Sequence, residues 1–148
     1  MDLRRLRFGE WLAVAGGIAL IVSLLLPWYD GPTGPLTGYE ALTLVDVLLT
    51  LVALLAIALG VLQATQDTPS KPVAAGVLSV VFGALAVLLV VFRLIDAPAD
   101  GLEVRPSAWL GLVAAVAITV GGWRSIAAEY VRGLPPDLEP ELRPTPAP

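Results

Sequence analysis

The sequence predicts an all-α fold, a four-helix transmembrane bundle that runs up-down-up-down with both termini in the cytoplasm. The chain of 148 residues is 57% hydrophobic and its mean hydropathy is +0.82. Too little polar surface remains to cover a water-soluble globule. Four stretches also lack Asp, Glu, Lys and Arg, and each offers the roughly 20 apolar residues that a helix needs to cross a bilayer. These stretches are 11–29, 47–66, 72–92 and 106–123.

We expect the four helical spans at residues 8–26, 41–62, 71–95 and 107–125. Helices are the only open-ended segments that satisfy their own backbone hydrogen bonds in lipid. The first span also resembles a secretory signal peptide, because Arg4, Arg5 and Arg7 precede an apolar run. No small-residue cleavage site follows and Glu10 interrupts the junction, so we expect this segment to remain as a membrane span.

The connections between the spans are short and contain turn residues. They cover residues 27–40, 63–70 and 96–106. Gly-Pro pairs in the first connection and an Asp-Gly pair in the last are typical of turns, and short links make consecutive helices antiparallel neighbours. We therefore expect one transmembrane domain over residues 1–126. Residues 127–148 hold six of the thirteen prolines, which predicts a cytoplasmic tail without a fold of its own.

Positive charge gathers on one side of the predicted membrane. With the N-terminus inside, seven of the nine Lys and Arg residues are cytoplasmic, and only Arg93 and Arg105 are external. This bias predicts a multi-pass protein of the cell (inner or plasma) membrane with both termini in the cytoplasm. A single Lys among many Ala, Leu, Val, Arg and Pro residues indicates a GC-rich bacterial genome. The cytoplasmic residues are Arg4, Arg5, Arg7, Lys71, Arg124, Arg132 and Arg143.

Aromatic residues lie at the ends of the predicted spans. Trp and Tyr favour the boundary between lipid tails and headgroups, where one end of the side chain is apolar and the other is wet. We therefore predict an aromatic belt. Its inner part is Trp11 and Trp123, and its outer part is Trp28, Tyr29, Tyr39 and Trp109.

Small residues recur at alternating spacings of three and four in the second and third spans, which places them on one face of each helix. Small residues let helices approach closely in lipid. Running the two faces antiparallel places Gly60 against Ser79, Ala53 against Ala86, and Asp46 against Arg93. Weaker stripes occur in the first and last spans. The second-span stripe is Thr43, Asp46, Thr50, Ala53, Ile57 and Gly60; the third is Gly76, Ser79, Gly83, Ala86, Val90 and Arg93; the last is Gly111, Ala114, Ile118 and Gly121.

The predicted pairing of Asp46 with Arg93 has two interpretations. An ionisable residue within a span is a functional candidate by default, and Thr43, Thr50 and Asp96 would complete a polar pocket open to the outside. The structural interpretation is an ion-pair clasp at the outer rim. At the inner face, Glu10 and Arg124 lie at matching depth, and we expect them to pair across the first and fourth helices.

Several classes of function are excluded by composition and motifs. The chain has no Cys and no His, which removes thiol nucleophiles, disulfides, haem ligation and most zinc sites. It also has no catalytic triad, nucleotide-binding glycine loop or cluster of metal ligands. The net charge of −4 argues against a nucleic-acid partner. We therefore expect neither an enzyme nor a cofactor or metal.

Two functions remain after these exclusions. The first is a non-catalytic membrane scaffold or accessory subunit, which associates with itself as an oligomer or joins a larger protein complex of the cell envelope. The alternative is a small channel or transporter component, formed by oligomerisation around the outer polar pocket. The lipid bilayer is the one partner that both functions require.

Three short motifs carry a family resemblance. Leu26-Pro27-Trp28-Tyr29 closes the first span, Arg93-Leu94-Ile95-Asp96 closes the third, and Trp109-Leu110-Gly111 opens the fourth. Together they resemble small four-span integral membrane proteins of actinobacteria, a largely uncharacterised group. The resemblance covers nearly the whole chain and implies a topology without a specific activity. Claudin-like proteins share the span count, but their cysteine-paired external sheet is excluded here.

Overall fold

The computed structural model describes residues 8–65 and 72–130, and most of the predicted tail lies outside them. Four long helices, α1 (Phe8–Leu25), α3 (Leu44–Thr65), α4 (Pro72–Ile95) and α5 (Pro106–Tyr130), account for most of this part. All four are long and apolar enough to cross a membrane, as the prediction of four such helices requires. Helix α5 continues past the predicted domain boundary at residue 126.

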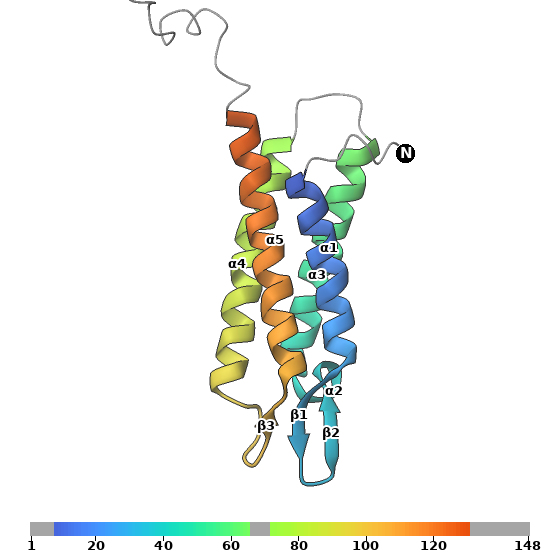
Figure 1. Cartoon of the computed structure of the whole chain (residues 1–148), viewed down its shortest axis with the longest axis vertical. Coiled ribbons are helices and arrows are strands. Elements are labelled where there is room, and N and C mark those ends of the chain that lie inside the picture. Colours follow the sequence, from blue (N-terminus) through green and yellow to red (C-terminus); the bar gives the residue numbers. More distant parts are fainter. Residues whose placement is uncertain (1–7, 66–71, 131–148) are drawn as a thin grey trace, which may run out of the picture.

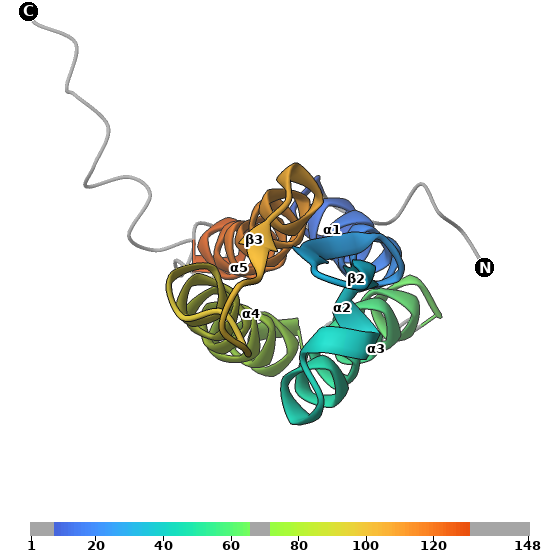
Figure 2. The same ribbon diagram turned by 90° about the horizontal axis from the view of Figure 1, so that it is seen from below.

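The four helices form a ring in the order α3, α1, α5, α4 (Figures 1 and 2). Helix α1 packs extensively along α5 and α3, and α5 packs along both α1 and α4. The contact between α3 and α4 is the least extensive of the four. The prediction that the second and third spans form the closely packed seam is therefore wrong. The most extensive contacts are made by α1 and α5, which we call the two central helices.

A three-stranded antiparallel sheet corrects the all-α prediction. Strands β1 (Pro27–Gly31), β2 (Gly34–Thr37) and β3 (Glu103–Val104) pair in the order β2-β1-β3. The hairpin turns at Pro32-Thr33, where Gly34 has a φ of +124° that few other residues adopt. Strand β1 pairs with β3 at Tyr29↔Val104. The sheet joins the connection after α1 to the connection before α5 without any disulfide, and we call this part of the bundle the sheet end.

A short helix, α2 (Gly38–Ala41), separates the sheet from α3, so the second span begins at residue 44 and not 41. Thr37 and Glu40 form a capping box at its start. The Glu40 carboxylate accepts hydrogen bonds from the backbone N–H of Thr37 at 2.9 Å and from its hydroxyl at 2.8 Å, and these bonds lower the pKa of Glu40. Thr43 then turns the chain with a φ of +51°.

Two pairs of adjacent glycines bring the central helices close to their neighbours. A Cβ atom at Gly121 would lie 2.6 Å from backbone atoms of α1, and one at Gly122 would lie 2.9 Å from the carbonyl oxygen of Gly76 in α4. In α1, a Cβ atom at Gly16 would lie 2.9 Å from the backbone of α5, and one at Gly17 would lie 2.8 Å from the backbone of α3. Adjacent helical residues point about 100° apart, so each pair serves two neighbours.

The small residues of the predicted seam contact other helices. A Cβ at Gly60 would meet Val14 of α1, and one at Gly83 would meet Thr119 of α5. Gly76 faces Gly122 and Ile126, also of α5. The buried residues Ala53 and Ala86 belong to the common core. The stripes thus mark packing faces, but a period of three and four does not specify which helix a face will meet.

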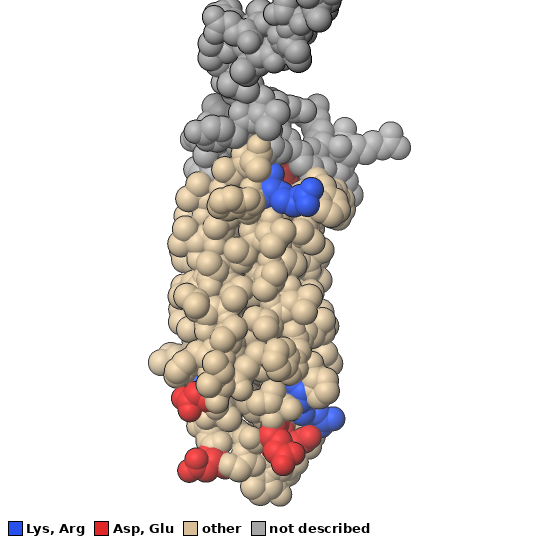
Figure 3. Space-filling view, turned by 60° about the vertical axis from the view of Figure 1, so that its left-hand side comes forward, with Lys and Arg blue, Asp and Glu red and all other residues tan. Residues whose placement is uncertain are grey.

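Charged residues lie at the two ends of the bundle, with an uncharged band between them on the face shown in Figure 3. Many large apolar side chains on the helices are exposed, among them Leu51, Leu88 and Val113. A water-soluble protein would not carry so large an apolar surface. This band has the chemistry of a surface that faces lipid tails.

We predict that Gly121→Ala destabilises the bundle by about 1–3 kcal/mol, because its Cβ would meet the rigid backbone of α1. The free energy of unfolding in mixed micelles measures the effect. Ala15→Val, which also enlarges a small residue but at an exposed position on α1, is the matched control and should change stability far less. Equal losses in the two variants would contradict the importance of this crossing.

Candidate functional site

Asp46 is a buried acid in the first turn of α3. Its carboxylate accepts a hydrogen bond from the backbone N–H of Val47 at 2.6 Å. The hydroxyl of Thr50 donates to the carbonyl oxygen of Asp46 at 2.7 Å and lies 3.0 Å from the hydroxyl of Tyr39. Unpaired N–H groups at a helix N-terminus stabilise a negative charge. The position of Asp46 is therefore explained by its own helix.

Arg93 does not form the predicted ion pair with Asp46, and none joins it to Asp96 in the described ranges. Its guanidinium carbon lies 5.7 Å from the centre of the Phe92 ring. Thr43 and Asp96, two other members of the predicted outer pocket, are both exposed. The predicted alignment of Asp46 with Arg93 required the second and third spans to pack tightly along their length. Helices α3 and α4 make only limited contact, so this alignment does not form.

Trp28 and Tyr29 are both fully buried where β1 meets the helices. The indole N–H of Trp28 donates to the carbonyl oxygen of Ser23 at 2.7 Å, and its ring fills the space beside Gly111. The hydroxyl of Tyr29 donates to the carbonyl oxygen of Arg93 at 2.7 Å. Consecutive strand residues normally point to opposite faces, but the register shift in this part of β1 is consistent with both being buried. We call Trp28 and Tyr29 with these contacts the aromatic clasp.

The aromatic clasp changes part of the predicted belt. Trp28 and Tyr29 are core residues and not lipid-facing ones, and Tyr39 is half-buried. Trp11, Trp109 and Trp123 are exposed, as belt residues would be. An aromatic residue near the end of a span can therefore either face the membrane boundary or pack inside the bundle, and the sequence alone did not show which.

Further contacts join β1 to the start of α5. The backbone N–H of Arg105 donates to the carbonyl oxygen of Trp28 at 2.8 Å. The guanidinium of Arg105 forms a partly exposed salt bridge with Asp30 at 2.9 Å. The hydroxyl of Ser107 donates to the carbonyl oxygen of Pro27. The sheet end is thus connected to α1, α4 and α5 by specific hydrogen bonds.

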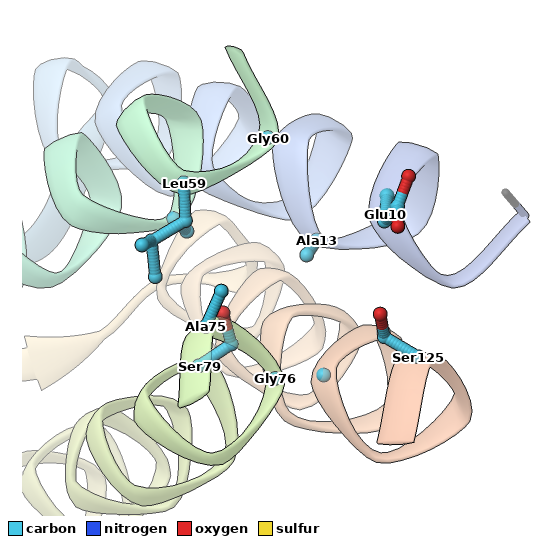
Figure 4. A pocket seen from close by; sticks show the side chains of 11 residues that line it. Glu10, Ala13, Leu59, Gly60, Ala75, Gly76, Ser79 and Ser125 are labelled. Atoms are coloured by element: carbon cyan, nitrogen blue, oxygen red, sulfur yellow. The ribbon is translucent and has the colours of Figure 1, made fainter. Parts of the chain in front are cut away.

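A second polar site lies at the opposite end of the bundle. A pocket between all four helices is lined by three buried polar residues, Glu10 of α1, Ser79 of α4 and Ser125 of α5 (Figure 4). Its other lining residues are apolar and mostly small. They are Ala13, Ala56, Leu59, Gly60, Ala75, Gly76, Gly121 and Gly122.

Only part of this pocket was predicted from the sequence. Arg124, the predicted partner of Glu10, is exposed, and its guanidinium carbon lies 5.3 Å from the centre of the Phe8 ring. Ser79 was predicted to be a packing residue, and Ser125 was not predicted to lie at a site. Ser125 follows Gly121 by four positions and so continues the small-residue stripe of α5, which is the signal that would have found it.

The described residues contain no group of three or more His, Cys, Asp or Glu that could hold a metal ion. Comparisons with protein-family models, with curated proteins and with solved structures found no match to this chain.

We predict that Tyr29→Phe destabilises the protein by about 1–2 kcal/mol at neutral pH, because the carbonyl oxygen of Arg93 loses a buried donor. Burial raises the pKa of Tyr29, an effect that the nearby charge of Arg93 partly offsets. A raised pKa means that the folded state holds the phenol proton more tightly than the unfolded chain does. The stability from Tyr29 is therefore complete below about pH 10 and falls as the pH rises further.

The difference in unfolding free energy between the wild type and Tyr29→Phe should consequently narrow above about pH 10. Denaturation measured from neutral to strongly alkaline pH tests this. A difference that stays constant over the whole range would show that Tyr29 ionises equally easily in both states.

Proposed function

We propose that this chain is a non-catalytic integral membrane scaffold or accessory subunit of a bacterial cell membrane, either self-associating or part of a larger envelope complex. The aromatic clasp is the observation that carries the proposal. Both rings are fully buried, and their polar atoms bond to carbonyl oxygens of α1 and α4. Buried and hydrogen-bonded rings are typical of a closed, rigid end of a bundle, whereas the entrance of a channel would be open to water.

The polar residues near the sheet end support the same choice. A channel built around Asp46 and Arg93 needs these side chains to line a shared space, but Asp46 bonds to its own helix and Arg93 lies over Phe92. Between the two ends, the residues where the helices meet include Leu20, Val90 and Ile118, all fully buried. An apolar core of this kind supports a structural role for a single copy.

The sheet end is the surface that we propose a protein partner recognises. Its acidic residues Asp30, Glu40, Asp100 and Glu103 are exposed. Strand β2 is an edge of the sheet and contains Pro35, which has no N–H to pair with an added strand. Recognition would therefore depend on side-chain charge and shape and not on extension of the sheet.

The proposed topology is up-down-up-down with both termini in the cytoplasm and the sheet end outside. It rests on the distribution of Lys and Arg in the sequence, of which Arg93, in the last turn of α4, and Arg105, paired with Asp30, are the two that this topology places outside. Single cysteines in this cysteine-free chain test it. Asp100→Cys should react with a membrane-impermeant maleimide on intact cells, and Leu138→Cys should react only after lysis. The reverse pattern would invert the assignment.

The scaffold proposal is tested on the purified full chain in nanodiscs and in liposomes. Native mass spectrometry should show a defined oligomer or a co-purified envelope protein, and ion flux through reconstituted liposomes should equal that of empty liposomes. Replacing Asp30, Glu40 and Glu103 together by their amides should release a heterologous partner. Flux that rises with the amount of protein would support the channel alternative, and a strict monomer with neither partner nor flux would contradict both.

A further inference from the structure

Arg93 is a cation without a counter-ion at the sheet end of α4. It lies in the last turn of the helix, and its side chain is partly buried. No hydrogen bond or ion pair joins its guanidinium to any described residue, the nearby acid Asp96 included. The Nε atom is inaccessible and cannot contact a guest. The two terminal nitrogens are not among the inaccessible polar atoms of the described residues, so they are free to bind one.

The guanidinium of Arg93 reaches the outer surface of α4. Arg93 continues the stripe of buried Ala86 and Val90, so its Cα lies on the inner face of the helix. Its guanidinium carbon nevertheless lies 5.7 Å from the centre of the Phe92 ring, and Phe92 is 54% exposed. A long Arg side chain near a helix end can carry its charge out of the hydrocarbon in this way. The charge therefore lies at the edge of the apolar band.

An apolar face and an acid lie on either side of this charge along α4. Leu88 and Ile95 are 67% and 82% exposed. The backbone N–H of Asp96 donates to the carbonyl oxygen of Phe92 at 2.8 Å, so the exposed Asp96 continues the helical turn. Residues four positions apart share a helix face, which places Leu88, Phe92 and Asp96 in one column. This column changes from apolar to acidic toward the sheet end, and the Arg93 guanidinium lies beside its middle member.

The order of these groups matches the order of groups in a phospholipid. Acyl chains suit the exposed face of Leu88, Phe92 and Ile95. A phosphate accepts strong, charge-assisted hydrogen bonds from a guanidinium. A headgroup ammonium beyond the phosphate would then meet the carboxylate of Asp96. Free inorganic phosphate offers neither the chains nor the ammonium group.

The charge of the sheet end distinguishes between classes of phospholipid. Acidic residues gather at this end (Figure 3). Arg105 is already paired with Asp30, so it does not offset the other acids. An anionic headgroup would add negative charge to a surface that is already acidic. A zwitterionic headgroup adds no net charge, and its ammonium complements Asp96. The acidic residues are Asp30, Glu40, Asp46, Asp96, Asp100 and Glu103.

We propose that the end of α4 binds a zwitterionic phospholipid of the phosphatidylethanolamine class, with its phosphate on the terminal nitrogens of Arg93 and its ammonium on the carboxylate of Asp96. The acyl chains lie along Leu88, Phe92 and Ile95. The bound lipid supplies the counter-ion that no described residue provides to Arg93. One copy of the chain contains the whole site, which is therefore independent of any protein partner.

Lipid binding to the purified full chain in detergent tests the proposal. Native mass spectrometry follows titrations with phosphatidylethanolamine and with phosphatidylglycerol that carry the same acyl chains, so the two lipids differ in the headgroup alone. We expect the unmodified chain to bind phosphatidylethanolamine about tenfold more tightly. Equal binding of the two lipids, or tighter binding of phosphatidylglycerol, would overturn the proposal. This comparison needs no variant and does not depend on how a substitution affects folding.

Two substitutions separate the roles of the two charges. Arg93→Gln removes the phosphate ligand and should weaken phosphatidylethanolamine binding about tenfold. The hydrogen bond from Tyr29 goes to the backbone carbonyl of Arg93, so this variant keeps the aromatic clasp. Asp96→Asn removes the ammonium ligand and should abolish most of the preference for phosphatidylethanolamine over phosphatidylglycerol.

Arg124→Gln and Asp100→Asn are the matched controls. Arg124 also lies over an aromatic ring, that of Phe8, but at the opposite end of the bundle. Asp100 is an exposed acid in the same connection as Asp96. Both variants should bind phosphatidylethanolamine as the wild type does. Binding that Arg93→Gln and Asp96→Asn leave unchanged would contradict the proposal, as would an equal weakening in all four variants.

Discussion

The close approach of helix backbones at two glycine pairs is the constraint on which the rest of the structure depends. Burial of apolar surface gives little drive for helices to associate in lipid, so close backbone packing has to supply it. Gly16-Gly17 and Gly121-Gly122 place such contacts on two faces of α1 and α5. Each of these helices can therefore have two close neighbours. The ring order α3, α1, α5, α4 follows, and α3 and α4 make the least extensive contact.

The same close approach determines what lies at each end of the bundle. At the sheet end, Gly111 has no side chain, and the Trp28 ring fills the space beside it. At the opposite end a small pocket lies between the helices, lined by Glu10, Ser79 and Ser125 together with Leu59 and several alanines and glycines. One end is thus filled by aromatic rings and the other keeps a small polar pocket.

The sequence predicted the four spans well because a run of about 20 uncharged apolar residues has one stable solution in a bilayer. It failed where partners are distant along the chain. Strand β3 has two residues and pairs with Tyr29 and Asp30 across more than two helices, so no local pattern marks it. The predicted pairing of Asp46 with Arg93 failed because helical periodicity defines a face and not its neighbour. Glu10 was recognised from its charge, whereas Ser125 was missed because the predicted stripe of the last span ended at Gly121.

Ser23 and Ser125 show why burial alone does not identify a site. Both hydroxyl oxygens are inaccessible and lack a partner among the described residues. Ser23 lies beside Gly111 where the Trp28 ring packs, and its own carbonyl oxygen accepts the indole hydrogen bond, so its surroundings are already filled. Ser125 belongs to the lining of the pocket between the four helices, yet its hydroxyl oxygen is as inaccessible as that of Ser23. Both serines thus lie where a glycine of a neighbouring helix packs closely, Ser23 beside Gly111 and Ser125 beside Gly9. An inaccessible hydroxyl without a partner is therefore a consequence of close helix packing in both places, and by itself it is no evidence of a ligand.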